Sequence, residues 1–166
     1  MAKAVRDKDL GYKRILKEIK KLEKKPHVKI GLLSNTGKQD KGFTSGDKIK
    51  TTSEVSVLEV GIYNEFGTDT IPSRPFMRTT HDEHNSKWFG MIRKFTGKMY
   101  EGKATVNMAL EIVGQQATAD MKNKIKKGPF TANAPATTKK KKSTKPLVDT
   151  AQLIGSINYQ IKMVQK

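Results

Sequence analysis

The chain has no cysteine among its 166 residues. Disulfide bonds and cysteine-based zinc sites are therefore excluded. No apolar run approaches the roughly 20 residues that a membrane helix needs. The first residues, MAKAVRDKDL, also lack the apolar segment of a secretory signal. From these absences we expect a soluble protein.

Acidic residues are scarce relative to basic ones. The sequence contains 16 Asp and Glu against 33 Lys and Arg, which gives a formal net charge of +17. Such a balance predicts a polyanionic partner, either nucleic acid, an acidic protein surface or anionic lipid. Lysine is the main basic residue, and lysine contacts phosphate groups without reading base sequence. A solvated basic surface with no such partner is an equally compatible interpretation.

The periodicity of apolar residues predicts an α+β fold in one domain spanning residues 1–166. We expect a few long helices packed on a small antiparallel sheet, with long polar loops. Helices are predicted over residues 9–25, 52–66 and 104–127, with a further helix opening at Pro75. Strands are predicted over 27–33 and 156–164, near the two ends of the chain, and we expect them to pair.

Two segments have little apolar material. Residues 34–50 contain three glycines, and residues 130–147 consist mainly of Pro, Ala, Thr and Lys. Residues 34–50 are predicted to be a mobile loop or an extended hairpin tip. Residues 130–147 cannot bury enough surface to order themselves alone and are predicted to be a mobile loop. The second loop contains a basic arm that is expected to face DNA or an acidic partner. The lysines of this arm are Lys139, Lys140, Lys141, Lys142 and Lys145.

Motifs for catalysis are weak. His81 and His84 flank Asp82 and Glu83 on a predicted helix, but they lack HExxH geometry and a third ligand is not evident. A solvated polar helix face is the favoured interpretation. The sequence has no GxSxG motif and no phosphate-binding GxxxxGK[ST] loop. We therefore predict a protein that is not an enzyme and holds neither cofactor nor metal.

Residues 64–78, NEFGTDTIPSRPFMR, form a segment that we call the corner. Gly67 is expected to adopt a left-handed backbone where the preceding helix ends. Phe66 and Phe76 are both predicted to turn inward. Glu65 is within plausible reach of Arg74 or Arg78.

Two prolines add stiffness to the corner. Pro72 and Pro75 restrict the unfolded chain and so lower the entropy cost of holding the turn. The corner is therefore predicted to be a rigid structural element. It either contacts a neighbouring subunit or serves only the folding of its own chain.

The corner and a later block together resemble the tail-completion, or neck, proteins of tailed bacteriophages. This family includes the lambda minor tail protein Z and the Mu virion-morphogenesis protein. The corner residues that match are Glu65, Phe66, Gly67, Thr68, Pro72, Arg74, Pro75, Phe76 and Arg78. The later block matches at Pro146, Leu147, Val148, Asp149, Thr150, Leu153, Ser156 and Ile157. Ala151 stands where the family usually has glycine.

The resemblance implies a structural virion protein without catalytic activity. Proteins of this family are ring-forming parts of the head–tail junction. The implied partners are further copies of the chain, the portal-side connector, and the tail terminator or tail tube protein. Genomic DNA passing along the lumen would be a nonspecific partner. The alternative is a sequence-nonspecific basic DNA-binding protein, indicated by the net charge and the basic arm.

Overall fold

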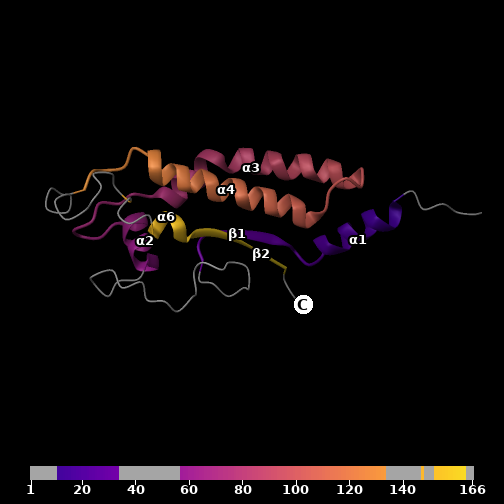
Figure 1. Cartoon of the computed structure of the whole chain (residues 1–166), viewed down its shortest axis with the longest axis horizontal. Coiled ribbons are helices and arrows are strands. Elements are labelled where there is room, and N and C mark those ends of the chain that lie inside the picture. The colour runs from indigo at the N-terminus through magenta and orange to yellow at the C-terminus, as the bar shows by residue number, and fades with distance from the viewer. Residues whose placement is uncertain (1–10, 34–56, 134–146, 148–151, 164–166) are drawn as a thin grey trace, which may run out of the picture.

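The computed structural model describes residues 11–33, 57–133, 147 and 152–163. These ranges form the predicted α+β fold, with helices packed on a small antiparallel sheet (Figure 1). The elements in chain order are α1 (Tyr12–Leu22), β1 (His27–Leu32), α2 (Val57–Phe66), α3 (Phe76–Tyr100), α4 (Val106–Lys127), α6 (Gln152–Ser156) and β2 (Ile157–Lys162). None of the described helices is both long and apolar enough to cross a bilayer.

The sheet joins two strands from near the two ends of the chain, as the sequence predicts. Strand β1 pairs antiparallel with β2, in a register that places His27 opposite Lys162 and Leu32 opposite Ile157. Two strands alone are marginal in water, so the sheet depends on the helices that cover it. This long-range pairing places both strands next to α4.

Helix α4 lies between α3 and the sheet, with α3 alongside it (Figure 1). The close approach to β2 requires Gly114, because a Cβ atom at that position would collide with the ring of Tyr159. The buried side of α4 includes the predicted residues Val106, Val113, Ala117, Met121 and Ile125. Leu110, also predicted on this side, is only half-buried.

Two clusters of buried side chains hold these layers together. One lies between α3 and α4 and contains Trp88, Val113 and Ala117. The other joins distant parts of the chain, and its buried members are Phe76, Met121, Ile125, Leu147, Leu153 and Ile157. The second cluster places the start of α3 against the end of α4 and the residues around α6.

The predicted element boundaries agree with the structure to within a few residues. Helix α1 is shorter at both ends than the predicted 9–25. Pro75 stands at the N-cap of α3 rather than at its first helical position. Gly128 ends α4, as the sequence predicts. The first predicted loop, 34–50, lies outside the described residues, as does most of the second.

Candidate functional site

Glu65 is the organising residue of the corner. It is the penultimate residue of α2, and only 4% of its surface is exposed. Its Oε2 accepts a hydrogen bond from the backbone N–H of Met77 at 2.8 Å, and its Oε1 accepts one from the N–H of Arg78 at 2.9 Å. The carboxylate of one helix thus satisfies the free N–H groups at the start of the next. Its negative charge also suits the dipole at that helix terminus.

Arg78 adds a second connection across the corner. Its Nε donates to Glu65 Oε1 at 3.2 Å, and its Nη2 donates to the Glu65 backbone carbonyl at 2.8 Å. The guanidinium carbon lies 5.0 Å from the centre of the Phe66 ring. Glu65 was expected to reach Arg74 or Arg78, and Arg78 is the partner.

Phe66 does not turn inward, so that prediction is wrong for one of the two phenylalanines. Phe76 is fully buried, whereas 65% of Phe66 is exposed. The inward position at the end of α2 is taken by Glu65, which the N–H groups of α3 require there. Successive residues of a helix are about 100° apart, so Phe66 is turned toward solvent and stacks under Arg78.

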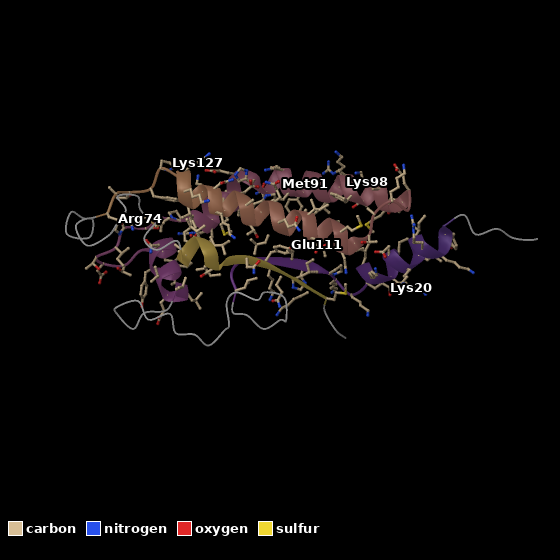
Figure 2. The ribbon with its side chains drawn as sticks, in the orientation of Figure 1. Lys20, Arg74, Met91, Lys98, Glu111 and Lys127 are labelled. Carbon is tan, nitrogen blue, oxygen red and sulfur yellow. The ribbon has the colours of Figure 1, made fainter. Side chains whose placement is uncertain are left out.

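Arg74 connects the corner to the segment that follows α4. Its side chain donates to two backbone carbonyl oxygens, those of Thr131 at 2.8 Å and Ala132 at 3.1 Å. It also donates to the side-chain oxygens of Asn64 at 3.0 Å and Asn133 at 3.1 Å. Burial lowers the pKa of Arg74, yet a guanidinium remains charged at neutral pH. Figure 2 shows Arg74 at the end of the molecule where α2 lies.

The turn between α2 and α3 closes on itself through the backbone. Gly67 has a φ of 82°, and a Cβ there would lie 3.0 Å from the Ser73 nitrogen. The predicted left-handed glycine is therefore confirmed. Thr68 and Ile71 exchange two backbone hydrogen bonds, and Thr68 Oγ1 also accepts from the Ile71 N–H at 3.1 Å. Thr68 and Pro72 are both exposed on the outer side of this turn.

The second family block is described only in part. Leu147, Leu153 and Ile157 are buried in the same cluster as Phe76. Ser156 is the last residue of α6, directly before β2. The other residues of the block and the lysines of the basic arm lie outside the described residues. These are Pro146, Val148, Asp149, Thr150, Lys139, Lys140, Lys141, Lys142 and Lys145.

The two histidines of α3 lie near an aromatic ring. The rings of His81 and His84 are centred 6.1 and 6.2 Å from that of Trp88. His81 Nδ1 is 3.3 Å from Asp82 Oδ1 in an exposed pair. Among the described residues, no group of three or more His, Cys, Asp or Glu side chains is placed to hold a metal ion.

An open hollow of about 500 Å³ lies beside the corner. Apolar side chains from β1, α3 and α4 contribute to its lining, and the polar groups there are Arg78, His81 and Asp82. Its lining thus combines one cation, one imidazole and one carboxylate with methionine and tryptophan side chains.

Two buried carboxylates were not anticipated from the sequence. Glu18 of α1 is 5% exposed, and its Oε2 accepts from the backbone N–H of Val106 at 2.9 Å. Asp120 of α4 is 8% exposed and accepts from Trp88 Nε1 at 2.9 Å. For Asp120, the sequence does contain a signal of burial, namely its position along the helix. Asp120 follows Val113 by seven residues and Ala117 by three, which places it on the buried side of the helix, where a charge needs a partner.

The Asp120 network should make stability depend on pH. Burial raises the pKa of Asp120, but hydrogen bonds from Trp88, Lys87 and Gln116 outweigh it, so the pKa is lowered. A lowered pKa means stability that is present above the ordinary Asp value of 3.8 and is lost as pH falls through the folded value. We expect Asp120→Asn to lower the free energy of unfolding by about 2 kcal/mol at pH 7 and by clearly less at pH 3.

Denaturant unfolding followed by fluorescence measures this difference, because Trp88 is the only tryptophan in the chain. Asp82→Asn is the matched control, since Asp82 lies in an exposed pair on the neighbouring helix. A loss for Asp120→Asn that is the same at pH 7 and pH 3 would contradict the assigned network.

The corner is therefore an arrangement of ion pairs, helix caps and packed rings. These groups fix the angle between α2 and α3 and attach the segment after α4. Neither a scan against protein-family models nor searches of curated proteins and of solved structures found a match to this chain.

Proposed function

We propose that the chain is a structural protein of the neck of a tailed bacteriophage. In this role it assembles as a ring that joins the portal-side connector to the tail and surrounds the DNA path. No catalysis is part of the proposal. The resemblance of the corner and of the later block to the tail-completion proteins is its source.

One structural observation supports reading the two blocks together. Phe76 of the corner packs in the same buried cluster as Leu147, Leu153 and Ile157 of the later block. Some seventy residues separate these blocks in the sequence, including the whole of α4. The two matching blocks are far apart in the sequence, yet they pack in one core. Chance matches to two short motifs would not be expected to pack together.

The corner suits a contact between subunits. Its inner groups are fixed by hydrogen bonds to Glu65 and Arg74, while Phe66, Thr68 and Pro72 remain exposed on its outer side. A rigid element loses little conformational freedom when it binds, so it can contribute affinity at low entropic cost. The proposed partners are neighbouring copies, the portal-side connector, and the tail terminator or tail tube protein.

The net charge of +17 fits a ring around nucleic acid. Phosphate groups of DNA passing through the lumen would attract lysines without any sequence preference. The same charge is the ground for the alternative function, a sequence-nonspecific DNA-binding protein that is not part of a particle. The location of the protein separates the two.

Immunogold electron microscopy of a phage lysate tests the proposal directly. We expect label from an antibody to this chain at the point where heads meet tails, and the chain itself in gradient-purified particles analysed by mass spectrometry. Antibody preabsorbed with the purified chain is the control. Label over the nucleoid, with none on particles, would reject the neck assignment and favour the DNA-binding alternative.

A further inference from the structure

Helix α1 is attached to the body of the protein by its polar side. Glu18 is the buried residue of this helix, and its Oε2 accepts a hydrogen bond from the backbone N–H of Val106 at 2.9 Å. Its Oε1 pairs with Lys21 Nζ at 2.6 Å. Arg14 lies against the turn between α3 and α4, where a Cβ on Gly102 would be 2.5 Å from Arg14 Nη2. These contacts determine which side of α1 faces solvent.

Four exposed lysines lie in a row on the solvent side of α1. They follow one another at intervals of four, three and four residues, which places them on one side of a helix. The four are Lys13, Lys17, Lys20 and Lys24, and we call them the lysine row. Lys24 comes just after the end of α1, but its N–H continues the turn by donating to the Lys21 carbonyl at 3.2 Å. The row is about 16 Å long, close to the rise of about five base pairs of duplex DNA.

Most of the row carries positive charge that is not neutralised locally. Lys17, Lys20 and Lys24 form no ion pair with any residue in the described part of the chain. The acids of residues 11–29 are Glu18 and Glu23. Glu18 is buried and bonded, and Glu23 lies four residues after Ile19, on a different side of the helix from the row. The row is therefore an exposed line of positive charge.

The stability of α1 does not account for all of this charge. Lysines in the last turn, such as Lys20, suit the negative end of the helix dipole. Lys13 and Arg14 lie in the first turn, where the dipole disfavours positive charge. Helix α1 has no acid in its first turn and no side-chain hydrogen bond at its N-cap. Positive charge at the start of this helix therefore needs a reason outside the helix, and a polyanionic partner provides one.

Basic residues are concentrated around α1. Residues 11–29 hold eight of the 33 Lys and Arg of the chain in nineteen positions, whereas α2 has none. The two helices lie at opposite ends of the molecule (Figure 1). Exposed lysines on the adjoining strands, Lys29 of β1 and Lys162 of β2, add to the charge near α1. Solubility alone does not require basic residues to be gathered in one part of the surface.

The residue types of the row favour a phosphate backbone over an acidic protein surface. Protein interfaces are depleted of lysine and enriched in arginine and aromatic residues, whereas the row consists only of lysine. The neighbouring arginine, Arg14, lies against Gly102. Lysine is a point charge on a flexible stem, and it contacts phosphate groups without reading the bases. A line of such charges matches the regular line of phosphates along a duplex.

We propose that the lysine row binds the phosphate backbone of duplex DNA without sequence preference. The contact releases counterions from the DNA, so the affinity depends steeply on salt. The row is a surface for the DNA contact of the proposed function, and the inference rests on that function for its biological setting. Because Glu18 and Arg14 attach α1 to the body, the row is already in place before DNA binds.

Salt-dependent binding to DNA tests the row. The row variant is the full chain with Lys17→Gln, Lys20→Gln and Lys24→Gln. The matched control removes the same charge near the end of α4, with Lys122→Gln, Lys126→Gln and Lys127→Gln. Figure 2 shows Lys127 and Lys20 toward opposite ends of the molecule. The fluorescence anisotropy of a short labelled duplex of mixed sequence gives the affinity between about 50 and 200 mM salt.

We expect the slope of log affinity against log salt concentration to fall by about 2.7 in the row variant, since each lost phosphate contact removes about 0.9. The control should lose less than about 1. A chain with Lys17→Arg, Lys20→Arg and Lys24→Arg keeps the charge and should bind as the native chain does. The basic arm is the same in every chain, so its contribution cancels. Thermal melts of each variant show whether the fold is retained.

Equal falls in slope for the row variant and the control would mean that DNA responds to net charge alone, which would overturn the proposal. A folded row variant that binds DNA as the native chain does would also overturn it. If that variant instead lost binding to phosphatidylserine vesicles, the row would belong to a lipid surface.

The outcome for the row is separable from that for the neck assignment. No effect of the row, with immunogold label at the head–tail junction, would reject this surface and leave the neck assignment standing. An effect of the row without label on particles would keep the surface and favour the alternative function.

Discussion

Replacing Phe76 with alanine is expected to lower the free energy of unfolding by about 4 kcal/mol. The side chain is fully buried in the cluster that joins α3, α4 and the residues around α6. Its removal loses the transfer energy of a phenyl ring and leaves a cavity that the neighbouring elements fill only partly. In a chain of this size the loss corresponds to a fall in melting temperature on the order of 10 °C.

Phe66→Ala is the matched control, ten residues earlier in the same corner. Its ring is 65% exposed and its ring partner is the Arg78 guanidinium, so we expect a loss below about 1 kcal/mol. Phe76→Leu keeps most of the volume and should cost about 1.5 kcal/mol, which guards against a variant that does not fold. Similar losses for Phe66→Ala and Phe76→Ala would contradict the different burial of the two rings.

The elements of the fold follow from local patterns in the sequence. The alternation in residues 156–164 and the short apolar run 27–33 predict the two strands, and their pairing follows because neither is stable alone. The left-handed Gly67 follows from its place after a helix and before a polar turn. The two strands and the left-handed glycine depend on neighbours within a few residues, so sequence reasoning reaches them. The pairing itself is long-range, and it could be predicted only because each strand needed a partner.

The orientation of α1 could not be predicted in the same way. Its apolar periodicity indicates a buried stripe, but the structure buries Glu18 and exposes Tyr12. Glu18 is buried because it accepts a hydrogen bond from the backbone N–H of Val106, which has no acceptor within its own helix. The two residues are 88 positions apart in the sequence, so the spacing of apolar residues within α1 does not indicate this contact.

The corner shows the same limit on a smaller scale. The residue types predict an ion pair with Glu65, yet they do not choose between Arg74 and Arg78. The choice is made by the segment 131–133, whose oxygens take three hydrogen bonds from Arg74. Likewise Glu65 is buried at the end of α2 and Phe66 is exposed. The carboxylate must reach the first N–H groups of α3, whereas the phenyl ring can remain in solvent.

Replacing Glu65 with alanine is expected to cost about 3 kcal/mol of unfolding free energy, the second largest effect that the structure indicates. The alanine variant leaves the N–H groups of Met77 and Arg78 without their acceptor at the start of α3. Arg78 is not stranded, since its Nη2 still donates to the backbone carbonyl of residue 65 and its side chain is 56% exposed. The cost should therefore come from the uncapped helix more than from a lost ion pair.

Glu65→Gln separates these two contributions. The amide keeps one acceptor oxygen but loses the charge, so we expect a loss of about half that of the alanine variant. Asp69→Ala, an exposed acid four residues later, should change stability by less than about 0.5 kcal/mol. Chemical denaturation of the four chains provides the comparison. If Glu65→Ala and Asp69→Ala were equally mild, Glu65 would not be the residue that fixes the corner. The rigidity that supports its proposed contact with a neighbouring subunit would then need another source.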